Sequence, residues 1–427
     1  MNTLIEELRW RGLLQDIIPE TEEQLNKEMT SGYVGFDPTS DSLHIGSLVP
    51  IILLMHLQKA GHKPFAIVGG ATGMVGDPSG KSEERNMLSM EQIQFNIAGI
   101  RKQLQHFLNF DENIANKAEL LDNYAWLKNM TFLDFIREVG KHITVNYMLS
   151  KDSVQRRLET GMSFTEFTYQ LVQGYDFYYL YEKHGVKLQM GGSDQWGNMV
   201  TGTELIRRKA QGSAFAFTAP LLKKADGGKF GKTEAGNVWL DATKTSPYRF
   251  YQFWLNTTDE DASSYIKIFT FLPKNDIEQL IAAHHAEPHL RALQKTLAKE
   301  LTVMVHGEAA YESAVEASQI LFSENTTEAL QKLDRQQLLD ILDGVPRFAI
   351  QHQDIENQVK LLDVLAQTGI MPSKGEARKM LQSGAIGINK VKISDVEFTL
   401  NKNHLLQNQY ILIQKGKKNY YLLEINH

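Results

Sequence analysis

Short apolar runs alternate with glycine-rich or polar turns and helical patterns in the first half of the chain. The runs at residues 33–36, 63–68 and 187–190 are predicted to be β-strands, and a turn sequence follows each of them. A helix is predicted over residues 43–60, where Gly61 ends it. Strand, turn and helix in repeated succession favour an α/β fold, a parallel sheet with helices on both faces. Ligands bind such sheets at the carboxyl ends of the strands, where these turns lie.

The second half of the chain has a different pattern. Residues 247–322 place apolar side chains three and four positions apart, which predicts helices. Residues 323–350 are polar and mixed, and we interpret them as a connector. The last block, residues 351–427, combines helical and strand patterns and is predicted to be a small α+β domain. Its expected elements are a helix at 361–381 and strands at 385–388 and 410–413.

Composition is that of an ordinary globular protein. The chain has 427 residues, 42% hydrophobic and 22% charged, which is enough for two or three domains. It has no cysteine, which excludes disulfides, thiolate zinc sites, iron–sulfur clusters and cysteine nucleophiles. The longest apolar run, residues 48–55, is too short to span a bilayer, and residues 1–15 look like an amphipathic helix rather than a signal peptide. We therefore expect a soluble, cytoplasmic protein without a membrane partner.

Charge is distributed unevenly along the chain, whose net charge is −6. From residue 374 to the end there are nine Lys or Arg and four Asp or Glu, a net charge of +5, which leaves −11 for the remainder. An acidic body that carries a small basic module indicates that the module meets nucleic acid.

Two segments look like phosphate-binding loops but lack their spacing. Residues 76–82 (G-D-P-S-G-K-S) place three residues between the glycines where a Walker loop has four, and residues 229–233 (K-F-G-K-T) have Asp226 where that loop has its first glycine. The glycines at 70, 73 and 76 are not a dinucleotide fingerprint either. The cations on these turns can still close over a polyphosphate, although each taken singly is more commonly a solvated surface charge. They are Lys81, Arg85, Lys229 and Lys232.

A polar face is predicted on the helical segment 168–181 (T-Y-Q-L-V-Q-G-Y-D-F-Y-Y-L-Y). Tyr169, Gln173 and Asp176 fall at positions i, i+4 and i+7, on one side of the helix. An aspartate among so many apolar side chains needs a polar partner, and a polar ligand is one candidate. The remaining tyrosines are better explained as core or interface residues.

The histidine-rich stretch at residues 284–289 (H-H-A-E-P-H) contains side chains that can bind a metal ion. Its spacing matches no helical pair of metal ligands. We interpret it as a solvated loop and predict no metal site.

Several motifs together resemble one protein family. The tetrapeptide His44-Ile45-Gly46-Ser47, which alone would be taken for a helix cap, resembles the HIGH motif of class I aminoacyl-tRNA synthetases. Residues 229–233 resemble their KMSKS loop in the form found in bacterial tyrosyl enzymes. Between them lie Y-V-G-F-D-P-T, G-D-P-S-G-K and G-G-S-D-Q-W-G-N, in the order of bacterial tyrosyl-tRNA synthetases. Residues 373–378 and 384–386 look like an RNA-binding domain shared with a ribosomal small-subunit protein, so the resemblance covers essentially the whole chain.

The resemblance implies a domain order. It consists of a Rossmann-like catalytic domain at 1–222, a helical tRNA-binding domain with the KMSKS-like loop at 223–322, a linker at 323–350 and a small RNA-binding domain at 351–427. An insertion near 110–160, in particular the segment 131–147, is expected to form the interface of a homodimer.

The resemblance also implies roles for individual residues. Tyr33 and Asp176 are expected to bind the phenolic hydroxyl of tyrosine, and its ammonium and the rest of the amino acid are expected to meet Asp77, Tyr169, Gln173, Gln189 and Gln195. The residues implied for ATP are Gly35, Asp37, Thr39, His44, Gly46, Ser47 and Asp194. Those implied to close over pyrophosphate are Lys81, Arg85, Lys229, Lys232 and Thr233. Those implied for RNA are Lys374, Arg378 and Lys379.

The HIGH-like motif departs from the family pattern at one position. Ser47 stands where the motif has its second histidine, so the contact with ribose is expected to be weaker or to use the hydroxyl. Phe230 and Gly231 replace the Met-Ser of the general KMSKS loop, which is the usual form in the tyrosyl branch.

The activity implied is that of a tyrosine–tRNA ligase. Such an enzyme activates L-tyrosine with ATP, accompanied by Mg²⁺, to tyrosyl-adenylate and pyrophosphate, and then transfers tyrosine to the 3′-terminal adenosine of tRNA(Tyr). Two alternatives are a tryptophanyl relative or small HIGH-bearing nucleotidyltransferase, and a paralogue that has lost catalysis and only binds RNA. The pair Tyr33 and Asp176 argues against an indole pocket. The intact lysines of residues 229–233 argue against a silent paralogue.

Overall fold

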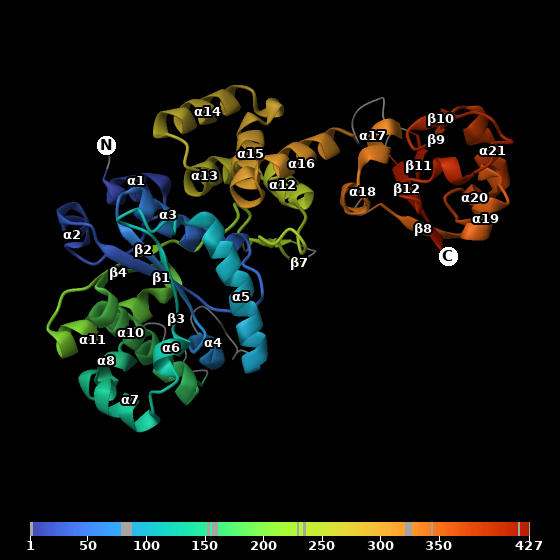
Figure 1. Cartoon of the computed structure of the whole chain (residues 1–427). Helices are drawn as coiled ribbons and strands as arrows, with labels where there is room; N and C mark the ends of the chain where they lie inside the picture. The colour runs from blue at the N-terminus through green and yellow to red at the C-terminus, as the bar shows by residue number, and fades with distance from the viewer. Residues whose placement is uncertain are drawn as a thin grey trace. The chain divides into compact units, whose positions relative to one another are not determined.

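The chain folds into two compact units, which are described separately (Figure 1). The structure is a computed structural model that describes residues 3–77, 88–151, 154–155, 161–228, 230–233, 236–320, 327–342, 345–416 and 419–426. The first unit comprises Met1–Thr245 and Phe253–Val305, and the second comprises Ser246–Gln252 and His306–His427.

A five-stranded parallel sheet forms the centre of the first unit. Its strands are β1 (Ser31–Phe36), β2 (Lys63–Val68), β3 (Glu119–Asp122), β4 (Val186–Gly192) and β5 (Phe215–Ala219). They lie in the order β3-β2-β1-β4-β5, and every neighbouring pair is parallel. The three strands predicted from the sequence fall within β1, β2 and β4, so these predictions are confirmed. The strand order reverses between β1 and β4, the position where open sheets of this kind bind ligands.

Helices cover both faces of this sheet (Figure 1). The alternating direction of successive side chains along β1 shows which helix covers which face. A Cβ atom added to Gly32 would lie 2.9 Å from Leu57 of α3 (Leu48–Lys59). The next residue, Tyr33, instead packs its ring 5.4 Å from that of Phe177 on α10 (Phe164–His184). Because successive side chains of a strand point to opposite faces, α3 and α10 lie on opposite sides. The predicted α/β fold is confirmed.

The helix expected over residues 43–60 begins later than predicted. His44 has an extended backbone (φ −123°, ψ 173°), and its side chain caps a short 3-10 turn at Ile45–Ser47 before α3 starts at Leu48. The expected amphipathic N-terminal helix is α1 (Leu4–Arg11). The other helices that precede or flank the sheet are α2 (Thr21–Lys27), α4 (Thr72–Val75), α5 (Met90–Phe107), α6 (Tyr124–Leu127), α7 (Phe132–Glu138), α8 (Val145–Leu149) and α11 (Trp196–Ala210).

The predicted helical region after the sheet is confirmed. It contains α12 (Pro247–Leu255), α13 (Asp259–Phe269), α14 (Lys274–Ala286), α15 (Ala292–His306) and α16 (Glu308–Ile320). The interpretation of residues 284–289 as a solvated loop is wrong for His284. This residue is buried on α14, and its Nε2 lies 2.9 Å from Asp259 Oδ1, because the helix continues through the first two histidines. Among the described residues, no cluster of His, Asp and Glu side chains is arranged to hold a metal ion.

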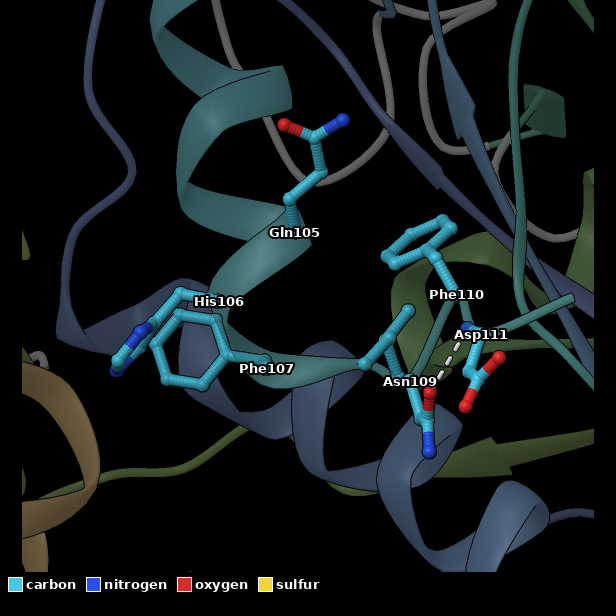
Figure 2. A pocket seen from close by; sticks show the side chains of 7 residues that line it. Gln105, His106, Phe107, Asn109, Phe110 and Asp111 are labelled. Atoms are coloured by element: carbon cyan, nitrogen blue, oxygen red, sulfur yellow. Dashed lines mark hydrogen bonds between the residues drawn. The ribbon is translucent and has the colours of Figure 1, made fainter.

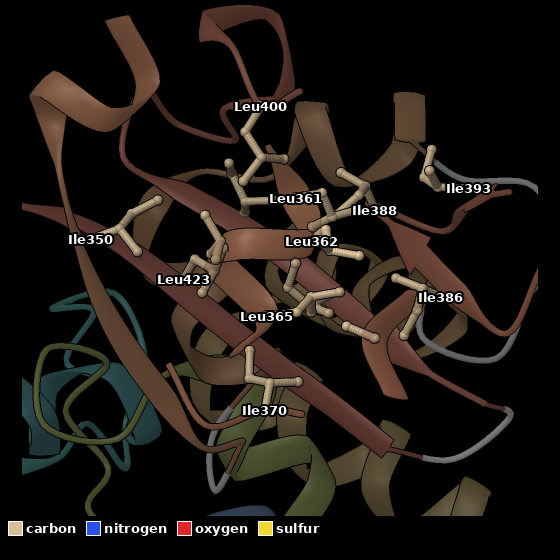
Figure 3. Close-up of a cluster of buried hydrophobic side chains, with 14 of the residues drawn as sticks. Ile350, Leu361, Leu362, Leu365, Ile370, Ile386, Ile388, Ile393, Leu400 and Leu423 are labelled. Atoms are coloured by element: carbon tan, nitrogen blue, oxygen red, sulfur yellow. The ribbon is translucent and has the colours of Figure 1, made fainter. Parts of the chain in front are cut away.

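The second unit is built on a five-stranded mixed sheet. Its strands are β8 (Arg347–Gln351), β9 (Ile386–Ile388), β10 (Val391–Ile393), β11 (Tyr410–Lys415) and β12 (Asn419–Asn426), in the order β10-β9-β11-β12-β8. Only the pair β12 and β8 is parallel among these neighbours. Figure 3 shows the buried aliphatic cluster between this sheet and its helices, with Leu361, Leu365 and Leu423 at its centre.

Two segments of the second unit differ from the pattern expected. The helix predicted over residues 361–381 is two helices, α20 (Leu361–Gln367) and α21 (Lys374–Gln382), because Gly369 has a left-handed backbone (φ 76°) and Pro372 follows it. The range interpreted as a connector contains α17 (Thr327–Lys332), α18 (Arg335–Ile341) and the start of β8. Leu330, Leu338 and Ile341 from these helices are buried in a second apolar cluster. The remaining helix is α19 (His352–Glu356). Within the part of the chain that is described, no helix combines the length and the apolar character needed to cross a membrane.

Candidate active site

A cavity of about 190 Å³ opens at the carboxyl ends of β1 and β4, beside α10. It lies where the strand order reverses. Nine residues that the sequence pointed to line it: Tyr33, Gly35, Asp37, Asp77, Tyr169, Gln173, Asp176, Gln189 and Gln195. The structure therefore brings the predicted tyrosine-binding residues together from four separate stretches of the chain.

The carboxyl of Asp176 is a buried polar group in the wall of the cavity. It is 5% exposed and accepts hydrogen bonds from Asn123 Nδ2 and Trp126 Nε1, both at 2.8 Å. Burial raises the pKa of Asp176 to about 7, although the two hydrogen bonds act to lower it. The carboxyl is thus held in place by the protein and is ready to accept a further donor.

Asn123 and Trp126 were not predicted from the sequence. Asn123 is the first residue after β3, and its amide also donates to Thr72 Oγ1 at 3.0 Å, while its carbonyl oxygen accepts from the Ala71 amide at 2.8 Å. The Trp126 ring stacks on Tyr179, with centroids 4.7 Å apart. A signal was available, because Asp-Asn directly after an apolar run is the kind of strand end that carries functional groups in a parallel sheet.

Two polar atoms in the cavity wall have no hydrogen-bond partner among the residues that the structure describes. The hydroxyl of Tyr33 and Oε1 of Gln189 are buried without a hydrogen bond, and both side chains are 3% exposed. Burial, and secondly the charge of Asp176, raises the pKa of Tyr33 well above its usual value, so the hydroxyl stays protonated. Because a buried polar group without a partner costs about 1–3 kcal/mol, this arrangement favours a polar ligand in the cavity.

Other residues of the cavity wall belong to a group of hydrogen-bonded carboxylates and amides. Gln195 Nε2 donates to Asp77 Oδ2 at 2.7 Å and to Asp194 Oδ2 at 3.2 Å. Asn198, another residue that the sequence did not single out, donates to Gln173 Oε1 at 2.9 Å. These acceptor-rich groups and the nearby Tyr169 suit a cationic ammonium group.

The HIGH-like turn is fixed by its own histidine. His44 Nδ1 accepts a hydrogen bond from the Gly46 amide at 3.0 Å. A Cβ atom at Gly46 would lie 2.7 Å from Cε1 of the His44 ring, so glycine is needed at this position for the turn itself. Ser47 ends the turn and is half-buried. Thr39 is exposed, and its amide donates to the Asp37 carbonyl at 2.9 Å.

The K-F-G-K-T loop lies against this turn and is anchored by Phe230. Gly231 has a left-handed backbone (φ 84°), and a Cβ atom there would lie 3.6 Å from the Gly46 amide nitrogen. The Phe230 ring packs in a cage of four aromatic side chains from α12 and α13, with centroid distances of 5.1 to 6.5 Å. We call this group, Phe253, Trp254, Tyr265 and Phe269, the aromatic cage.

Five residues make up the predicted phosphate clamp. Lys81, Arg85 and Lys229 lie outside the described residues. Lys232 and Thr233 form the two-residue strand β6, which pairs with β7 (Gly236–Asn237). Only the backbone of these two residues is described.

The predicted RNA-binding residues lie on α21 of the second unit. Lys374, Arg378 and Lys379 are exposed, while Ala377 and Leu381 of the same helix are buried. Lys374 forms an ion pair with Asp363 at 2.7 Å. The helix thus presents a basic outer face and an apolar inner face.

A larger hollow, of about 570 Å³, lies at the end of α5 and is lined by residues 105–111 (Figure 2). None of the predicted site residues lines it. Its polar backbone is satisfied locally, since the Asp111 amide donates to Asn109 Oδ1 at 2.9 Å and the Asn109 amide to Gln58 Oε1 at 2.9 Å. The cavity at β1 and β4 is therefore the better candidate for an active site.

Known proteins with similar sequences and structures identify the family. The family model described as tRNA synthetases class I (W and Y) matches residues 25–323, and the model of the tyrosine–tRNA ligase SYY-like C-terminal domain matches residues 337–423. The tyrosine–tRNA ligase of Bacteroides thetaiotaomicron is 58% identical over 98% of this chain and 99% of its own length. That of Cytophaga hutchinsonii is 58% identical over 100% of both chains.

A solved structure agrees with these sequence relatives. The crystal structure of a C-terminally truncated mitochondrial tyrosyl-tRNA synthetase from Aspergillus nidulans matches with a TM-score of 0.67 and 29% identity, over 75% of this chain and 95% of that one. The chain belongs to the class I tRNA synthetases of the tryptophanyl and tyrosyl group, in the tyrosine–tRNA ligase branch.

Proposed function

We propose that this protein is a tyrosine–tRNA ligase whose amino acid pocket is the cavity between β1, β4 and α10. The observation that carries the proposal is the buried carboxyl of Asp176 beside the unpartnered hydroxyl of Tyr33. A phenolic hydroxyl between them accepts from Tyr33 and donates to Asp176. An indole has no oxygen to accept from Tyr33, which favours tyrosine over tryptophan as the substrate.

The remaining pocket residues orient the amino acid for reaction. Asp77, Tyr169 and Gln173 receive the α-ammonium group, with Gln195 holding Asp77 in place at 2.7 Å. The free Oε1 of Gln189 offers one more acceptor. The tyrosine carboxylate is then directed out of the cavity, towards the HIGH-like turn.

ATP binds across the HIGH-like turn and the K-F-G-K-T loop. Gly35, Asp37, Gly46, Ser47 and Asp194 contact the nucleotide. His44 and Thr39 meet its phosphates, and the cations Lys81, Arg85, Lys229 and Lys232, with Thr233, close over pyrophosphate. The Gly35 position faces open space, so its backbone can approach a ligand closely. Mg²⁺ arrives with the ATP.

The reaction needs no covalent intermediate on the enzyme. The tyrosine carboxylate attacks the α-phosphorus of ATP, the bond to the β-phosphate oxygen breaks, and pyrophosphate leaves with the electron pair. A hydroxyl of the terminal tRNA adenosine then attacks the tyrosyl carbonyl and releases AMP. Orientation of the reactants and stabilisation of phosphate charge supply the rate acceleration.

The second unit is proposed to hold tRNA. Its basic face on α21, with Lys374, Arg378 and Lys379, meets the phosphate backbone, so binding weakens as salt rises. With tRNA, ATP and tyrosine as its substrates, the protein acts in the cytoplasm.

The protein is also proposed to form a homodimer through the segment 131–147. Phe132, Leu133 and Ile136 on α7 are 63%, 75% and 48% exposed, and Val145 on α8 is 59% exposed. An apolar group of this kind on a protein surface favours contact with another protein. Leu133→Glu should convert the dimer to a monomer in sedimentation analysis, whereas Phe95→Glu, at an exposed apolar residue on α5, should leave it unchanged.

One experiment tests the proposed function. Labelled pyrophosphate should exchange into ATP in the presence of tyrosine, and far less with tryptophan or phenylalanine. Exchange that depends on tryptophan would favour the tryptophanyl relative. No exchange with any amino acid, together with tight RNA binding, would favour the non-catalytic paralogue.

A further inference from the structure

The segment that follows the K-F-G-K-T loop, residues 236–245, pairs with the turn that carries His44. We call it the arm. His44 and Trp239 form an isolated antiparallel bridge. Two backbone hydrogen bonds, of 2.9 and 2.8 Å, flank this bridge and join Ile45 and Leu43 to the arm. The loop is therefore continuous with a segment whose backbone is fixed to the histidine turn.

The side chains of the bridge also meet. The His44 and Trp239 rings lie 6.1 Å apart, centroid to centroid, at an angle of 71°, which is the preferred edge-to-face geometry of aromatic pairs. His44 Nδ1 accepts from the Gly46 amide, so a neutral His44 ring carries its proton on Nε2. The imidazole is thus oriented by an amide at one nitrogen and by an indole beside the ring.

Trp239 is itself held by the chain around it. Its amide donates to Thr245 Oγ1 at 3.0 Å, and the Lys244 ammonium lies 5.3 Å from the centre of its ring. Lys244 forms an ion pair with Asp41 Oδ1 at 2.6 Å, and this contact lowers the pKa of Asp41. Asp41 lies three residues before His44. The ring of contacts formed by Asp41, His44, Trp239 and Lys244 is called the clasp.

The indole is not needed to hold the arm in place. Val238 and Leu240, on either side of Trp239, are 6% and 5% exposed and pack into the core. Trp239 points to the other side of the strand and is only half-buried. Removing its ring should therefore leave the fold intact while taking away one of the contacts that orient His44.

We propose that Trp239 is a positioning residue that acts through His44. It holds the imidazole in the orientation from which Nε2–H donates to the leaving phosphates of ATP. The clasp thereby links the segment that follows the K-F-G-K-T loop to the proposed contact between His44 and the phosphates of ATP. This inference rests on the proposed function, because it deepens the phosphate-binding role proposed for His44.

Three variants test the role of the indole by tyrosine-dependent pyrophosphate exchange. Trp239→Leu should lower kcat about 5- to 10-fold, in the upper part of the range that one edge-to-face aromatic contact contributes, with the KM for tyrosine changed less than about twofold. Trp239→Phe, which keeps an aromatic ring beside His44, should recover most of the rate. Trp10→Leu removes a half-buried tryptophan on α1 and should change neither parameter.

A double-mutant cycle tests whether the indole acts through the histidine. In a His44→Asn background, Trp239→Leu should cause no further loss of rate. The same 5- to 10-fold loss in that background, an unchanged rate in Trp239→Leu, or an equal loss in Trp239→Phe would each overturn the proposal.

A spectroscopic readout keeps this test separate from the proposed function. Labelled histidine should show His44 as the Nε2–H tautomer, with ring signals shifted by the indole, and Trp239→Leu should remove that shift. Absence of tyrosine-dependent exchange in the wild-type protein would overturn the proposed function and, with it, the role of the clasp. A normal wild-type exchange with no effect of Trp239→Leu on the His44 signals would overturn the clasp alone.

Discussion

The proposed amino acid pocket and the proposed ATP region are stabilised in different ways. In the pocket, buried polar side chains hold one another: Asp176 accepts from Asn123 and Trp126, and Gln195 donates to Asp77. In the region proposed for ATP, which comprises the HIGH-like turn and residues 230–233 and 236–245, backbone pairing and aromatic packing dominate. Phe230 enters the aromatic cage, and Trp239 pairs with His44.

Under the proposed function, this difference separates the recognition of tyrosine from the chemistry of its activation. A network of buried hydrogen bonds is rigid, because each member that loses its partner pays the cost of desolvation. It suits a contact that must already be in place when the amino acid arrives. Backbone pairing and packing around one aromatic ring fix the loop itself, while the contacts proposed for its cations are made in the transition state.

The largest expected effect is the loss of specificity in Asp176→Ala. Its kcat/KM for tyrosine should fall about 10³-fold or more, since the hydroxyl loses its carboxyl partner inside a buried site, whereas the value for phenylalanine should change less than about tenfold. Asp340→Ala, at a buried carboxylate of the second unit, is the matched control and should leave the ratio of the two values unchanged. An unchanged ratio in Asp176→Ala would place the hydroxyl contact elsewhere.

Stability should depend on pH through the same carboxyl. The pKa of Asp176 is about 7 in the folded protein, against 3.8 for an ordinary aspartate, so between pH 4 and pH 7 the folded state retains a proton that the unfolded state has released. Relative to Asp176→Asn, the wild-type free energy of unfolding should therefore fall by about 4 kcal/mol as pH rises through this window, and level off above it. Chemical denaturation across the range measures this, and a constant difference would contradict the burial argument.

Phe230, which anchors the K-F-G-K-T loop, should affect the rate of adenylate formation and not the binding of tyrosine. Phe230→Ala removes the ring from the aromatic cage and should slow adenylate formation about 100-fold, because the loop cations lose their position, while tyrosine binding stays within about twofold. Phe230→Leu should be milder. Phe95→Ala, at a 63% exposed phenylalanine of α5, should change nothing. Weakened tyrosine binding in Phe230→Ala would mean that the loop supports the pocket as well.

The smallest effect is expected when one of the two hydrogen-bond donors to Asp176 is removed. Trp126→Phe keeps a ring that can stack on Tyr179 but removes the N–H that donates to the carboxyl at 2.8 Å. Because the hydrogen bond from Asn123 to Asp176 is still present, the ratio of kcat/KM for tyrosine to that for phenylalanine should fall only about tenfold. Tyr179→Leu tests the stacking alone and should leave that ratio within about twofold. Equal losses in both variants would assign Trp126 a packing role only.

Much of the sheet and its pocket could be predicted because the signals are local. Strands β1, β2 and β4 were found from apolar runs that end in turns, and Tyr169, Gln173 and Asp176 share a face because helical spacing requires it. The short strands β3 and β5 were missed, since brief apolar runs do not distinguish strands from buried helix. The partners of Asp176 depended on β3, so they were missed with it.

Other features depend on contacts between distant segments and could not be found in this way. Asn123 and Asp176 are 53 residues apart in the sequence. They meet only because the strand order β3-β2-β1-β4 brings the end of β3 to the same sheet. Trp239 stands beside His44 because the arm returns to the HIGH-like turn. The buried His284 is different, since it lies seven residues after the buried Ile277 on α14, and helical spacing alone could have placed both on one face.

The division of labour between the two regions can be measured directly in single-turnover experiments. These separate the dissociation constant of tyrosine from the rate constant of adenylate formation. Asp176→Ala should raise the dissociation constant and leave the rate constant nearly unchanged, because the hydroxyl contact is equal in ground and transition states. Phe230→Ala should do the reverse. If both variants changed the same constant, recognition and chemistry would share one structure, and the separation of the two regions would be contradicted.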